Sequence, residues 1–483
     1  MLNPAISRKR WSALAPVVAA LLAAAATPAQ NVFTFPTNSS TVAPDTPAST
    51  LLVPYFEVDL GNPNGMNTIF TINNSGSDSF RTFNGGPPHT DQQGPTAILA
   101  HVVIWSDLGV PVFNFNVYLT GFDVERVNMR NVLNGLLPQT ASAGQDPADT
   151  ISPRSFISQD INFASCANPA NTPVLFNSSS QLPPRPLTAA QIAHIQNSLT
   201  GRPTASVSGK CAGLNHGDLV ARGYITVDTV SNCTSKTPAD PGYIGPGGTG
   251  DMTDQTQLTG EVYYYNPSQN IAYGGDVVHV HVAPTDPAAG FANKSYTFYG
   301  DYDGFNGADD RQPLATNFTA RFLSGSLASP AGGGAGGTDE RSLRVAPPPG
   351  STSLIVWRDP KVVQTYFTCG VLPSWYPLGQ EGITAFDEQE HPTTITGVTP
   401  FGAATQLVKI GGASLPVMPL SGSLYLDLNT TVTGQSANLA DPAAAQAWVE
   451  VVEQDGLKLL NVQHRAQQLD SANQAIHVFP ELF

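Results

Sequence analysis

Glycine and proline interrupt this chain so often that few long helices can form in it. The 483 residues include 44 glycines and 41 prolines, and both residue types destabilise the interior of a helix. The segments between them are short and many alternate apolar with polar residues, as in residues 112–119, where Phe113, Phe115 and Val117 share one face of an expected strand. Apolar residues make up 41% of the chain, which is enough to fill hydrophobic cores. The sequence therefore predicts a folded, loop-rich β-protein rather than a disordered chain.

The first strand-forming region predicts an antiparallel β-sandwich. Its expected strands are separated by turn residues and occupy residues 51–59, 68–73, 97–105, 112–119 and 123–133, the last with a short helical turn as an alternative ending. A parallel sheet would need helical crossovers between these strands, and this region shows no helical pattern of that length. Short strands without crossovers are typical of an immunoglobulin-like sandwich. We expect this N-terminal β-sandwich domain to span residues 49–138.

A second β-rich region follows a connector. Residues 139–210 are rich in Ser, Asn, Pro and Ala, with one expected helix at residues 189–198. Strand patterns return beyond it, and a Gly/Pro-rich loop spans residues 330–350. We therefore expect a loop-rich connector followed by a C-terminal β-rich domain over residues 211–483. The predicted fold class is all-β, with two or three immunoglobulin-like β-sandwich domains, long polar loops and little helix.

The strands expected in the C-terminal region are short. They occupy residues 221–230, 260–265, 276–282, 353–357, 424–428, 447–454 and 457–464. Asp455 and Gly456 lie between the last two strands, and an Asp-Gly pair is a strong signal for a two-residue hairpin turn.

The N-terminus has the pattern of a secretory signal peptide. Residues 8–10 are all basic, and residues 11–26 form an uncharged apolar stretch rich in Ala, Leu and Val. A cut after Ala26 or Ala29 would satisfy the small-residue rule of signal peptidase. A retained membrane anchor is the alternative, but the apolar run is shorter than the roughly 20 residues of a bilayer span. We expect residues 1–29 to be a signal peptide.

The expected destination is outside the cytoplasm. Residues 30–48 form a Ser/Thr/Pro-rich linker, and no later segment has the length and apolarity of a transmembrane span. The sequence therefore predicts export by the secretory pathway to the periplasm, the cell surface or the extracellular medium, with no transmembrane span in the mature chain.

The net charge of −15 argues against nucleic-acid binding. Lys and Arg number 22 against 37 Asp and Glu, so phosphate backbones and anionic lipids would be repelled. Charged residues are only 12% of the chain, and Asn, Ser and Thr occupy many of the expected surface positions.

Four cysteines, Cys166, Cys211, Cys233 and Cys369, lie far apart and form no CxxC pair. In an oxidising compartment they predict two disulfides, with three connectivities open. Our preferred pairing is Cys166 with Cys211 and Cys233 with Cys369.

Two groups of residues are candidate metal ligands. Asp301, Asp303, Asp309 and Asp310 crowd the turn GDYDGFNGADD, and carboxylates this close together often bind calcium, although the spacing is not that of an EF-hand. Asp, Asn and Gly also favour a solvated turn without an ion. Calcium is thus the one cofactor that the sequence suggests.

His279 and His281 stand two residues apart on an expected strand. Their imidazoles would project from the same face, which is the spacing that a metal needs from a strand pair. No third ligand stands close by in the sequence, and a polar strand face explains the same two residues.

Carbohydrate binding and hydrolysis have weaker signals. Residues 387–391 (DEQEH) form a second acidic cluster that could supply a carboxylate pair for a glycosidase, and a solvated loop is the alternative. Tyr263, Tyr264, Tyr265, Trp375 and Tyr376 could stack on sugar rings or pack in a core. The sequence contains no GxSxG, HExxH, SxxK or P-loop motif, so it assigns no catalytic residue.

Several segments together resemble a recurring set of exported bacterial β-rich proteins that have no assigned activity. The resemblance covers about residues 51–471 and rests on these strings in this order: LLVPYFEVD, AHVVIWSDLGVPVFNFNVYLTGFDVERVNMRNVL, ARGYITVDTV, RQPLATNFTARF, IVWRDPK, SWYPL, FDEQE, LYLDLN and QAWVEV. It implies a shared extracellular β-fold and brings no cofactor or catalytic residue with it.

These observations favour one function class and leave two others open. The favoured class is an exported, non-enzymatic surface or extracellular protein with a structural, adhesive or binding role. Its partners would be cell-surface or extracellular matrix components, or further copies of the chain. The alternatives are a calcium- or carbohydrate-binding module and a secreted hydrolase that uses a carboxylate pair or a metal.

Overall fold

The computed structural model describes sixteen segments of the chain. They are residues 46–76, 98–119, 122–138, 178–179, 186–282, 297–303, 308–315, 317–323, 351–359, 363–378, 382–396, 400–416, 421–428, 446–454, 461–465 and 467–469. Within these segments the chain forms β-sheets with mainly antiparallel pairing and two α-helices, which confirms the all-β prediction. Neither helix in this described part has the length and apolarity to cross a bilayer.

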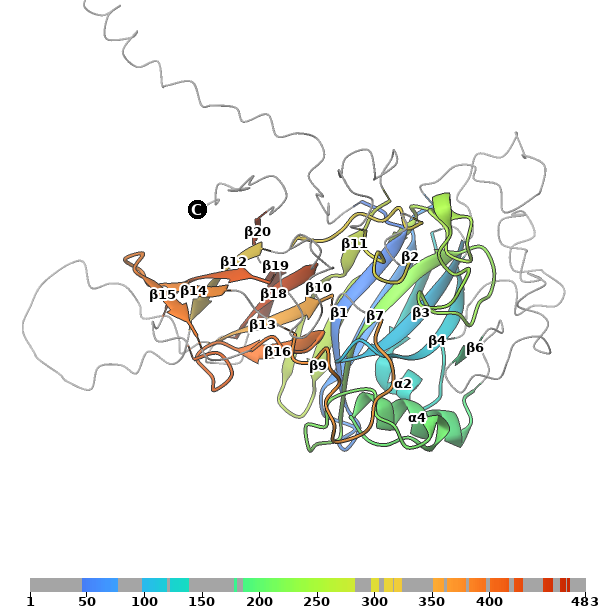
Figure 1. Cartoon of the computed structure of the whole chain (residues 1–483), viewed down its shortest axis with the longest axis horizontal. Coiled ribbons are helices and arrows are strands. Elements are labelled where there is room, and N and C mark those ends of the chain that lie inside the picture. The colour runs from blue at the N-terminus through green and yellow to red at the C-terminus, as the bar shows by residue number, and fades with distance from the viewer. Residues whose placement is uncertain are drawn as a thin grey trace, which may run out of the picture. The chain divides into compact units, whose positions relative to one another are not determined.

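The largest sheet of the described residues, which we call the central sheet, has the strand order β11-β1-β7-β3-β4-β6. Figure 1 shows β1, β7, β3 and β4 side by side. The strands are β1 (Thr50–Asp59), β3 (Ile98–Ser106), β4 (Pro111–Leu119), β6 (Ser178–Ser179), β7 (Val220–Val230) and β11 (Val278–Val280).

A second sheet packs against one face of the central sheet. Its order is β10-β9-β2-β5, with β8 paired to β2. Its strands are β2 (Asn67–Asn74), β5 (Val124–Asn128), β8 (Leu258–Thr259), β9 (Glu261–Asn266) and β10 (Ile271–Asp276). One core joins the two sheets and includes Val53, Phe70, Val102, Phe115, Val227 and Tyr264. Full burial of each such side chain contributes about 1.5–3 kcal/mol, so this sandwich is held chiefly by the hydrophobic effect.

Two helices close one end of this core. They are α2 (Met129–Leu133) and α4 (Ala189–Leu199), which bury Leu133 and Ile195 in it. The first residue before α4, Thr188, accepts a hydrogen bond from the backbone N–H of Gln191, whose side chain in turn accepts from the Thr188 N–H. This capping box fixes where α4 begins, and α4 is the helix expected at residues 189–198.

The central sheet is buried on both faces. In β3, Val102 and Ile104 belong to the core just described, whereas Val103 and Trp105 point to a second cluster on the opposite face. That cluster is completed by residues far along the chain, among them Tyr243, Phe298, Tyr299, Trp357 and Trp448. Burial on both faces explains why ILAHVVIWS reads as a nearly continuous apolar run rather than as a clean alternation.

Proline in the first strand is accommodated by an irregularity. The pairing of β1 with β7 shifts register between Val53 and Phe56, and Pro54 lies within this shift. Proline has no N–H to give to a sheet, so a bulge is one of the few places where a central strand tolerates it.

The C-terminal strands form a second sandwich. One sheet has the order β15-β14-β17-β12-β20, and the other has the order β16-β13-β18-β19. Their strands are β12 (Asn317–Leu323), β13 (Ser351–Arg358), β14 (Gly382–Phe386), β15 (Pro392–Ile395), β16 (Thr405–Lys409), β17 (Ser421–Asp427), β18 (Ala447–Gln454), β19 (Asn461–Arg465) and β20 (Gln467–Leu469).

The second sheet of this C-terminal sandwich also has two buried faces. Val449 and Val451 of β18 lie in the C-terminal core, together with Phe318 and Leu424 from the opposite sheet. Trp448 of the same strand belongs instead to the cluster on the outer face of the central sheet. Successive side chains of β18 point to opposite faces of its sheet, so this strand packs into the C-terminal core on one face and into the cluster on the central sheet on the other.

Strands from beyond the expected connector complete the N-terminal sandwich. β7 lies between β1 and β3, and β9 pairs with β2. The sheets therefore do not follow the expected division into domains at residues 49–138 and 211–483. Strand patterns reveal where strands are, but sequence alone does not show which distant strands pair.

The last hairpin is confirmed as an antiparallel pair, but its expected two-residue turn is wrong. Gln454 of β18 pairs with Asn461 of β19, so the paired ends lie further apart in sequence than Asp455–Gly456 allows. The Asp-Gly pair correctly indicated that the chain reverses here, but it did not predict which residues of the two strands pair.

The preferred disulfide pairing is also wrong. Cys211 is bonded to Cys369, with 5.1 Å between their Cα atoms and 158 residues between them in sequence. Cys233 is disulfide-bonded as well, and Cys166 lies outside the described residues. The backbones of Cys211 and Phe367 exchange two hydrogen bonds of 2.9 Å, so the bond forms where two distant segments already meet.

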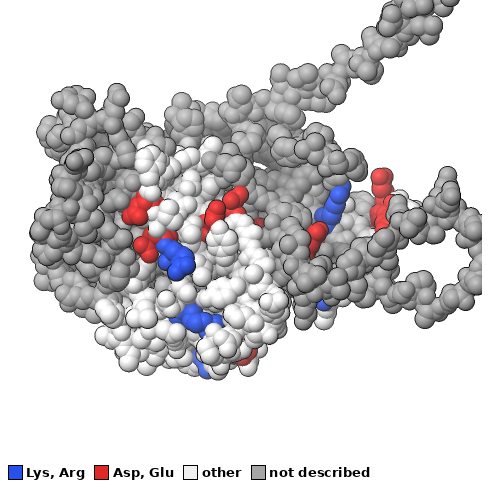
Figure 2. All heavy atoms as spheres, turned by 180° about the vertical axis from the view of Figure 1, so that it is seen from behind, with Lys and Arg blue, Asp and Glu red and all other residues white. Residues whose placement is uncertain are grey.

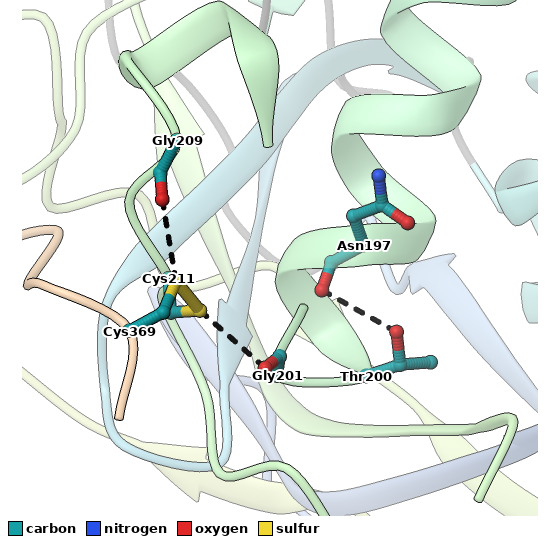
Figure 3. The surroundings of a disulfide bond; sticks show 6 residues. All are labelled: Asn197, Thr200, Gly201, Gly209, Cys211 and Cys369. Atoms are coloured by element: carbon teal, nitrogen blue, oxygen red, sulfur yellow. Dashed lines mark hydrogen bonds between the residues drawn. A yellow bond between two sulfur atoms is a disulfide. The ribbon is translucent and has the colours of Figure 1, made fainter. Parts of the chain in front are cut away.

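Figure 3 shows the surroundings of this disulfide. Sγ of Cys211 lies 3.4 Å from the carbonyl oxygen of Gly201, and Sγ of Cys369 lies 3.3 Å from that of Gly209. A disulfide sulfur carries no proton, so these are close packing contacts. The bond thus fastens the segment that follows α4 to the segment around residues 366–369.

Replacing both cysteines of this pair with serine should lower the free energy of unfolding by about 2–5 kcal/mol. A disulfide that closes a long loop restricts the unfolded chain, and loss of a native one typically costs this much. Urea denaturation of the double variant Cys211→Ser/Cys369→Ser would measure the change. Lys210→Ala, at an exposed neighbouring position, is the control and should change stability by less than about 0.5 kcal/mol. Equal midpoints for the double variant and the control would contradict the expectation.

Candidate functional site

The four aspartates of the expected calcium turn have different roles. Oδ2 of Asp303 accepts hydrogen bonds from the backbone N–H groups of Ala308 at 2.8 Å and Asp309 at 3.1 Å. Oδ2 of Asp309 accepts from the N–H of Tyr299 at 2.7 Å. Oδ2 of Asp310 accepts from the N–H of Gly247 at 3.0 Å. The turn is therefore built by carboxylate-to-backbone hydrogen bonds.

The carboxylates of the described part of this turn contact different backbone groups. Among the residues that the structure describes, no three His, Cys, Asp or Glu side chains lie close enough to hold a metal ion. Residues 304–307 of the turn are outside the described part. The described part of the turn thus fits the alternative of an Asx-type turn.

Arg311, just after these aspartates, is a fully buried cation. Its Nη2 donates to the carbonyl oxygen of Thr253 at 2.8 Å, and Nε donates to Oγ1 of Thr50. Nη1 lies 3.6 Å from Oδ1 of Asp309 and 3.7 Å from Oδ1 of Asp254. Burial alone would lower the pKa of Arg311, but the nearby carboxylates outweigh it and raise the pKa.

Asp228 of β7 is the buried anion beside Arg311. Its carboxylate lies 3.9 Å from Nε of Arg311 and accepts hydrogen bonds from the hydroxyls of Tyr243 at 2.6 Å and Tyr299 at 3.0 Å. Thr50 donates to the same carboxylate. These groups form a polar network inside an otherwise apolar cluster and connect three distant parts of the chain. A buried ion pair is tolerated when hydrogen bonds also satisfy its remaining atoms, as they do for this carboxylate.

Asp301 lies in a different environment. Both carboxylate oxygens are shielded from solvent, and neither meets a donor in good hydrogen-bonding geometry. Burial raises the pKa of Asp301 well above its ordinary value, the nearby Asp359 raises it further, and the N–H groups of Asp301 and Tyr302 oppose this. The Asp301 carboxyl group is therefore held toward its protonated form.

Six aromatic side chains surround this region in a closed series of contacts. Trp105 stacks on Tyr224 with ring centroids 5.5 Å apart, and Tyr302 lies 5.8 Å from Trp105. Trp357, Phe298 and Tyr299 complete the series through contacts of 4.8–6.1 Å. Tyr224 and Tyr302 of this series interact electrostatically with Asp301, so its carboxyl group lies near aromatic rings.

His279 and His281 lie in different surroundings. His279 is buried in β11 opposite Leu51 of β1. Nε2 of His281 lies 3.1 Å from Oγ1 of Thr46, and its backbone carbonyl accepts from the N–H of Gln312 at 2.8 Å. No third metal ligand joins them in the described segments.

The acidic run at residues 387–391 closes the turn between β14 and β15. Oδ1 of Asp387 accepts from the backbone N–H groups of Gln389 at 2.9 Å and His391 at 2.8 Å, and Oδ2 lies 3.1 Å from Nδ1 of His391. The N–H of His391 is the main cause that lowers the pKa of Asp387. This geometry is that of an exposed turn and does not bring two carboxylates together across a cleft.

Tyr263, Tyr264 and Tyr265 follow one another in β9, so their side chains point alternately to its two faces. Tyr264 is buried and stacks on Tyr273 and Tyr55, with centroids 4.8 Å and 6.4 Å away. Tyr263 is 45% exposed on the other face of β9, where its hydroxyl donates to Glu261. Tyr264 thus packs in the core, and the three rings do not form one surface on which a sugar could stack.

A histidine that the sequence did not single out is the centre of another polar cluster. His194 of α4 is buried, and its Nδ1 lies beside the hydroxyl of Ser206 and 3.1 Å from Oγ1 of Thr204. Nε2 lies 3.3 Å from the carbonyl oxygen of Val112 and 3.0 Å from the hydroxyl of Tyr366. Burial lowers the pKa of His194, so the imidazole is neutral near pH 7.

Three elements bring this cluster together. His194 lies on α4, Ser206 lies in the 3₁₀ turn η4 (Ala205–Val207), and Tyr366 comes from the segment that the Cys211–Cys369 disulfide fastens. No sequence motif links these residues, because twelve positions separate Ser206 from His194 and the tyrosine is far along the chain. The predicted helix was the only available signal, since it would place His194 near the core.

The fold and its bonded cysteines define a class of protein: an all-β, multi-sheet protein stabilised by disulfides. Comparisons with models of known families, with curated proteins and with solved structures found no match. The site must therefore be interpreted from its own geometry.

Replacing Arg311 with methionine should destabilise the protein by about 3–5 kcal/mol. The substitution keeps much of the side-chain volume but leaves Asp228 and Asp309 as buried carboxylates without their cation, and breaking a buried pair this way is costly. Lys236→Met is the control, because Lys236 and Asp251 form a partly exposed pair with N and O 3.1 Å apart, worth about 0–1 kcal/mol. Chemical denaturation would compare the two variants. Similar losses in both would contradict the role assigned to Arg311.

Replacing Asp301 with asparagine should change how stability depends on pH. The pKa of Asp301 is raised in the folded protein, whereas an unfolded aspartate titrates near pH 4, roughly its model-peptide value. The folded state therefore retains a proton that the unfolded state releases, and stability falls as pH rises above about 4 by up to about 1.4 kcal/mol per pH unit. Asp301→Asn removes this loss, so its melting temperature should exceed that of the parent increasingly as the pH rises above about 4.

Asp387→Asn provides a control in which stability should change with pH in the opposite direction. The pKa of Asp387 is lowered in the fold, so its contribution is present above the unfolded pKa and is lost in acid. This variant should fall below the parent at neutral pH and approach it in acid. Melting curves of both variants across this range would test the pair. A constant offset between Asp301→Asn and the parent at every pH would refute the assignment of Asp301.

Proposed function

We propose that this chain is exported and serves outside the cytoplasm in a structural, adhesive or binding role. The observation that carries the proposal is the disulfide between Cys211 and Cys369, which joins segments 158 residues apart. Cytoplasmic thiols are kept reduced, so a disulfide in such a position supports folding in an oxidising compartment. The basic and apolar pattern of residues 1–29 supports the same route.

The two sandwiches support a structural or binding role of the immunoglobulin-like type. Each consists of two sheets with a shared core, and antiparallel pairing predominates. We propose that they are immunoglobulin-like modules, in which loops at the ends of a rigid sandwich are free to contact partners.

The surface fits uncharged contacts better than strongly charged ones. Only 12% of the residues are charged, and in Figure 2 the Lys, Arg, Asp and Glu side chains form small separate groups among uncharged residues. Edge strands offer backbone groups for strand addition, and β15, at the edge of its sheet, has the exposed residues Pro392, Thr393 and Thr394. Cell-surface or extracellular partners, or further copies of the chain, could bind in this way.

Export would be tested by expressing the full chain and a variant without residues 1–29 in a bacterial host. We expect the full chain outside the cytoplasm, trimmed after Ala26 or Ala29, with Cys211 and Cys369 protected from a thiol reagent. The shortened chain should remain in the cytoplasm with both thiols reactive. Cell fractionation, N-terminal sequencing and mass spectrometry after alkylation would measure these outcomes. A full chain that stays uncut in the cytoplasm with free thiols would refute the proposal.

A further inference from the structure

The hydrogen bonds around His194 have the directions expected for a hydroxyl nucleophile paired with a base. The carbonyl oxygen of Val112, 3.3 Å from Nε2, can only accept a hydrogen bond, so this contact favours the proton of the neutral imidazole on Nε2. Nδ1 is then an acceptor, and the hydroxyl of Ser206 lies in contact with it. A hydroxyl bonded to a base that a third group orients is the arrangement shared by hydroxyl nucleophiles.

Neighbouring hydroxyls complete this arrangement. The hydroxyl of Tyr366 lies 3.0 Å from Nε2 and can accept from it alongside Val112. Oγ1 of Thr204 lies 3.0 Å from Oγ of Ser206 and 3.1 Å from Nδ1, so it can donate to either atom. No carboxylate is among the polar partners of His194 that the structure records, so a backbone carbonyl and a tyrosine hydroxyl orient the imidazole in place of an acid.

The position of Ser206 leaves one side of its turn toward solvent. Ser206 is half-buried within η4, while Ala205 and Ser208 on either side are exposed. Ser208 has the positive φ of 59°, which is uncommon for a residue other than glycine and shows that the turn is tightly constrained. The buried base thus contacts a turn in which Ala205 and Ser208 are exposed.

The disulfide holds both halves of the cluster. Cys211 follows the η4 turn, and Cys369 follows Tyr366 in the partner segment. The reciprocal backbone hydrogen bonds between Cys211 and Phe367 keep these segments in fixed register. The alignment of Ser206, His194 and Tyr366 is therefore covalently supported.

We propose that Ser206 is a nucleophile activated by His194 and that it accepts acyl groups from ester substrates. Oγ of Ser206 forms a bond to the acyl carbon while its proton passes to Nδ1 of His194. The ester bond breaks, and His194 returns the proton to the departing alcohol oxygen. Water then attacks the acyl-serine with His194 again as base, which releases the acid and restores the hydroxyl. This activity goes beyond the proposed function and does not depend on it.

The test is covalent labelling of the purified, disulfide-bonded mature protein with a fluorophosphonate probe. The native protein should incorporate one phosphonyl group, and peptide mapping should place it on Ser206. Ser206→Ala should incorporate none, and His194→Gln should react at least about 100-fold more slowly, as expected for loss of a general base. Ser208→Gly, two positions along the same turn, should label like the parent.

Two further measurements distinguish a variant that fails to fold from one that folds but lacks the base. Melting temperatures of all variants show whether each is folded, and the labelling rate across pH reports the base. Because burial lowers the pKa of His194, the rate should reach its plateau below the ordinary histidine value of about 6.5. No labelling of the native protein, or labelling that persists in folded Ser206→Ala, would overturn the proposal and leave His194 as a structural residue. Either result would leave the export proposal untouched.

Discussion

Burial of the central sheet on both faces is the constraint on which the rest of the structure depends. A sheet in an ordinary two-layer sandwich has one face in a core and one in water, and its strands then alternate apolar with polar residues. In β3 and β7 of this chain both faces are buried. The second sheet covers one face, and the other face is covered by Tyr243, Phe298, Trp357 and residues near them. The N-terminal sandwich therefore needs side chains from the C-terminal half to bury its own hydrophobic surface.

The polar groups within this second cluster show how its layers are held in register. Apolar packing is not directional, but the contacts of Asp228 with Arg311, Tyr243 and Tyr299 are. A buried carboxylate in the wrong position would lack these donors and would cost several kcal/mol, roughly the penalty of an unpaired buried charge. Asp301 is the counterexample in the same cluster, because its carboxyl oxygens have no well-aligned donor among the described residues and burial raises its pKa. The network thus combines a hydrogen-bonded carboxylate beside a buried arginine with one carboxyl group whose charged form is disfavoured by burial.

Local features of the fold were predictable from the sequence, whereas its long-range contacts were not. Expected strands at residues 51–59 and 112–119 correspond to β1 and β4, because apolar alternation and turn residues act locally. The pairing of β7 with β1 and β3 and the Cys211–Cys369 bond depend on residues more than a hundred positions apart. The surroundings of Asp301 likewise depend on Tyr224 and Asp359, which are distant in sequence. For the same reason the sequence could not distinguish the surroundings of the four aspartates at the expected calcium turn. Closeness in sequence does not show that one carboxylate binds a backbone N–H while another is aimed at an arginine.

The same limit explains why the cluster at His194 was missed, and it connects that cluster with the environment of the chain. A helix, a tight turn and a distant loop each supply one polar group, and their spacing in sequence has no recognisable motif. The disulfide is the covalent link that fixes the turn and the loop against each other. Because such a bond persists only where thiols are oxidised, reduction would remove the covalent link between the turn and the loop. The position of the disulfide thus links the arrangement around His194 to the oxidation state of Cys211 and Cys369.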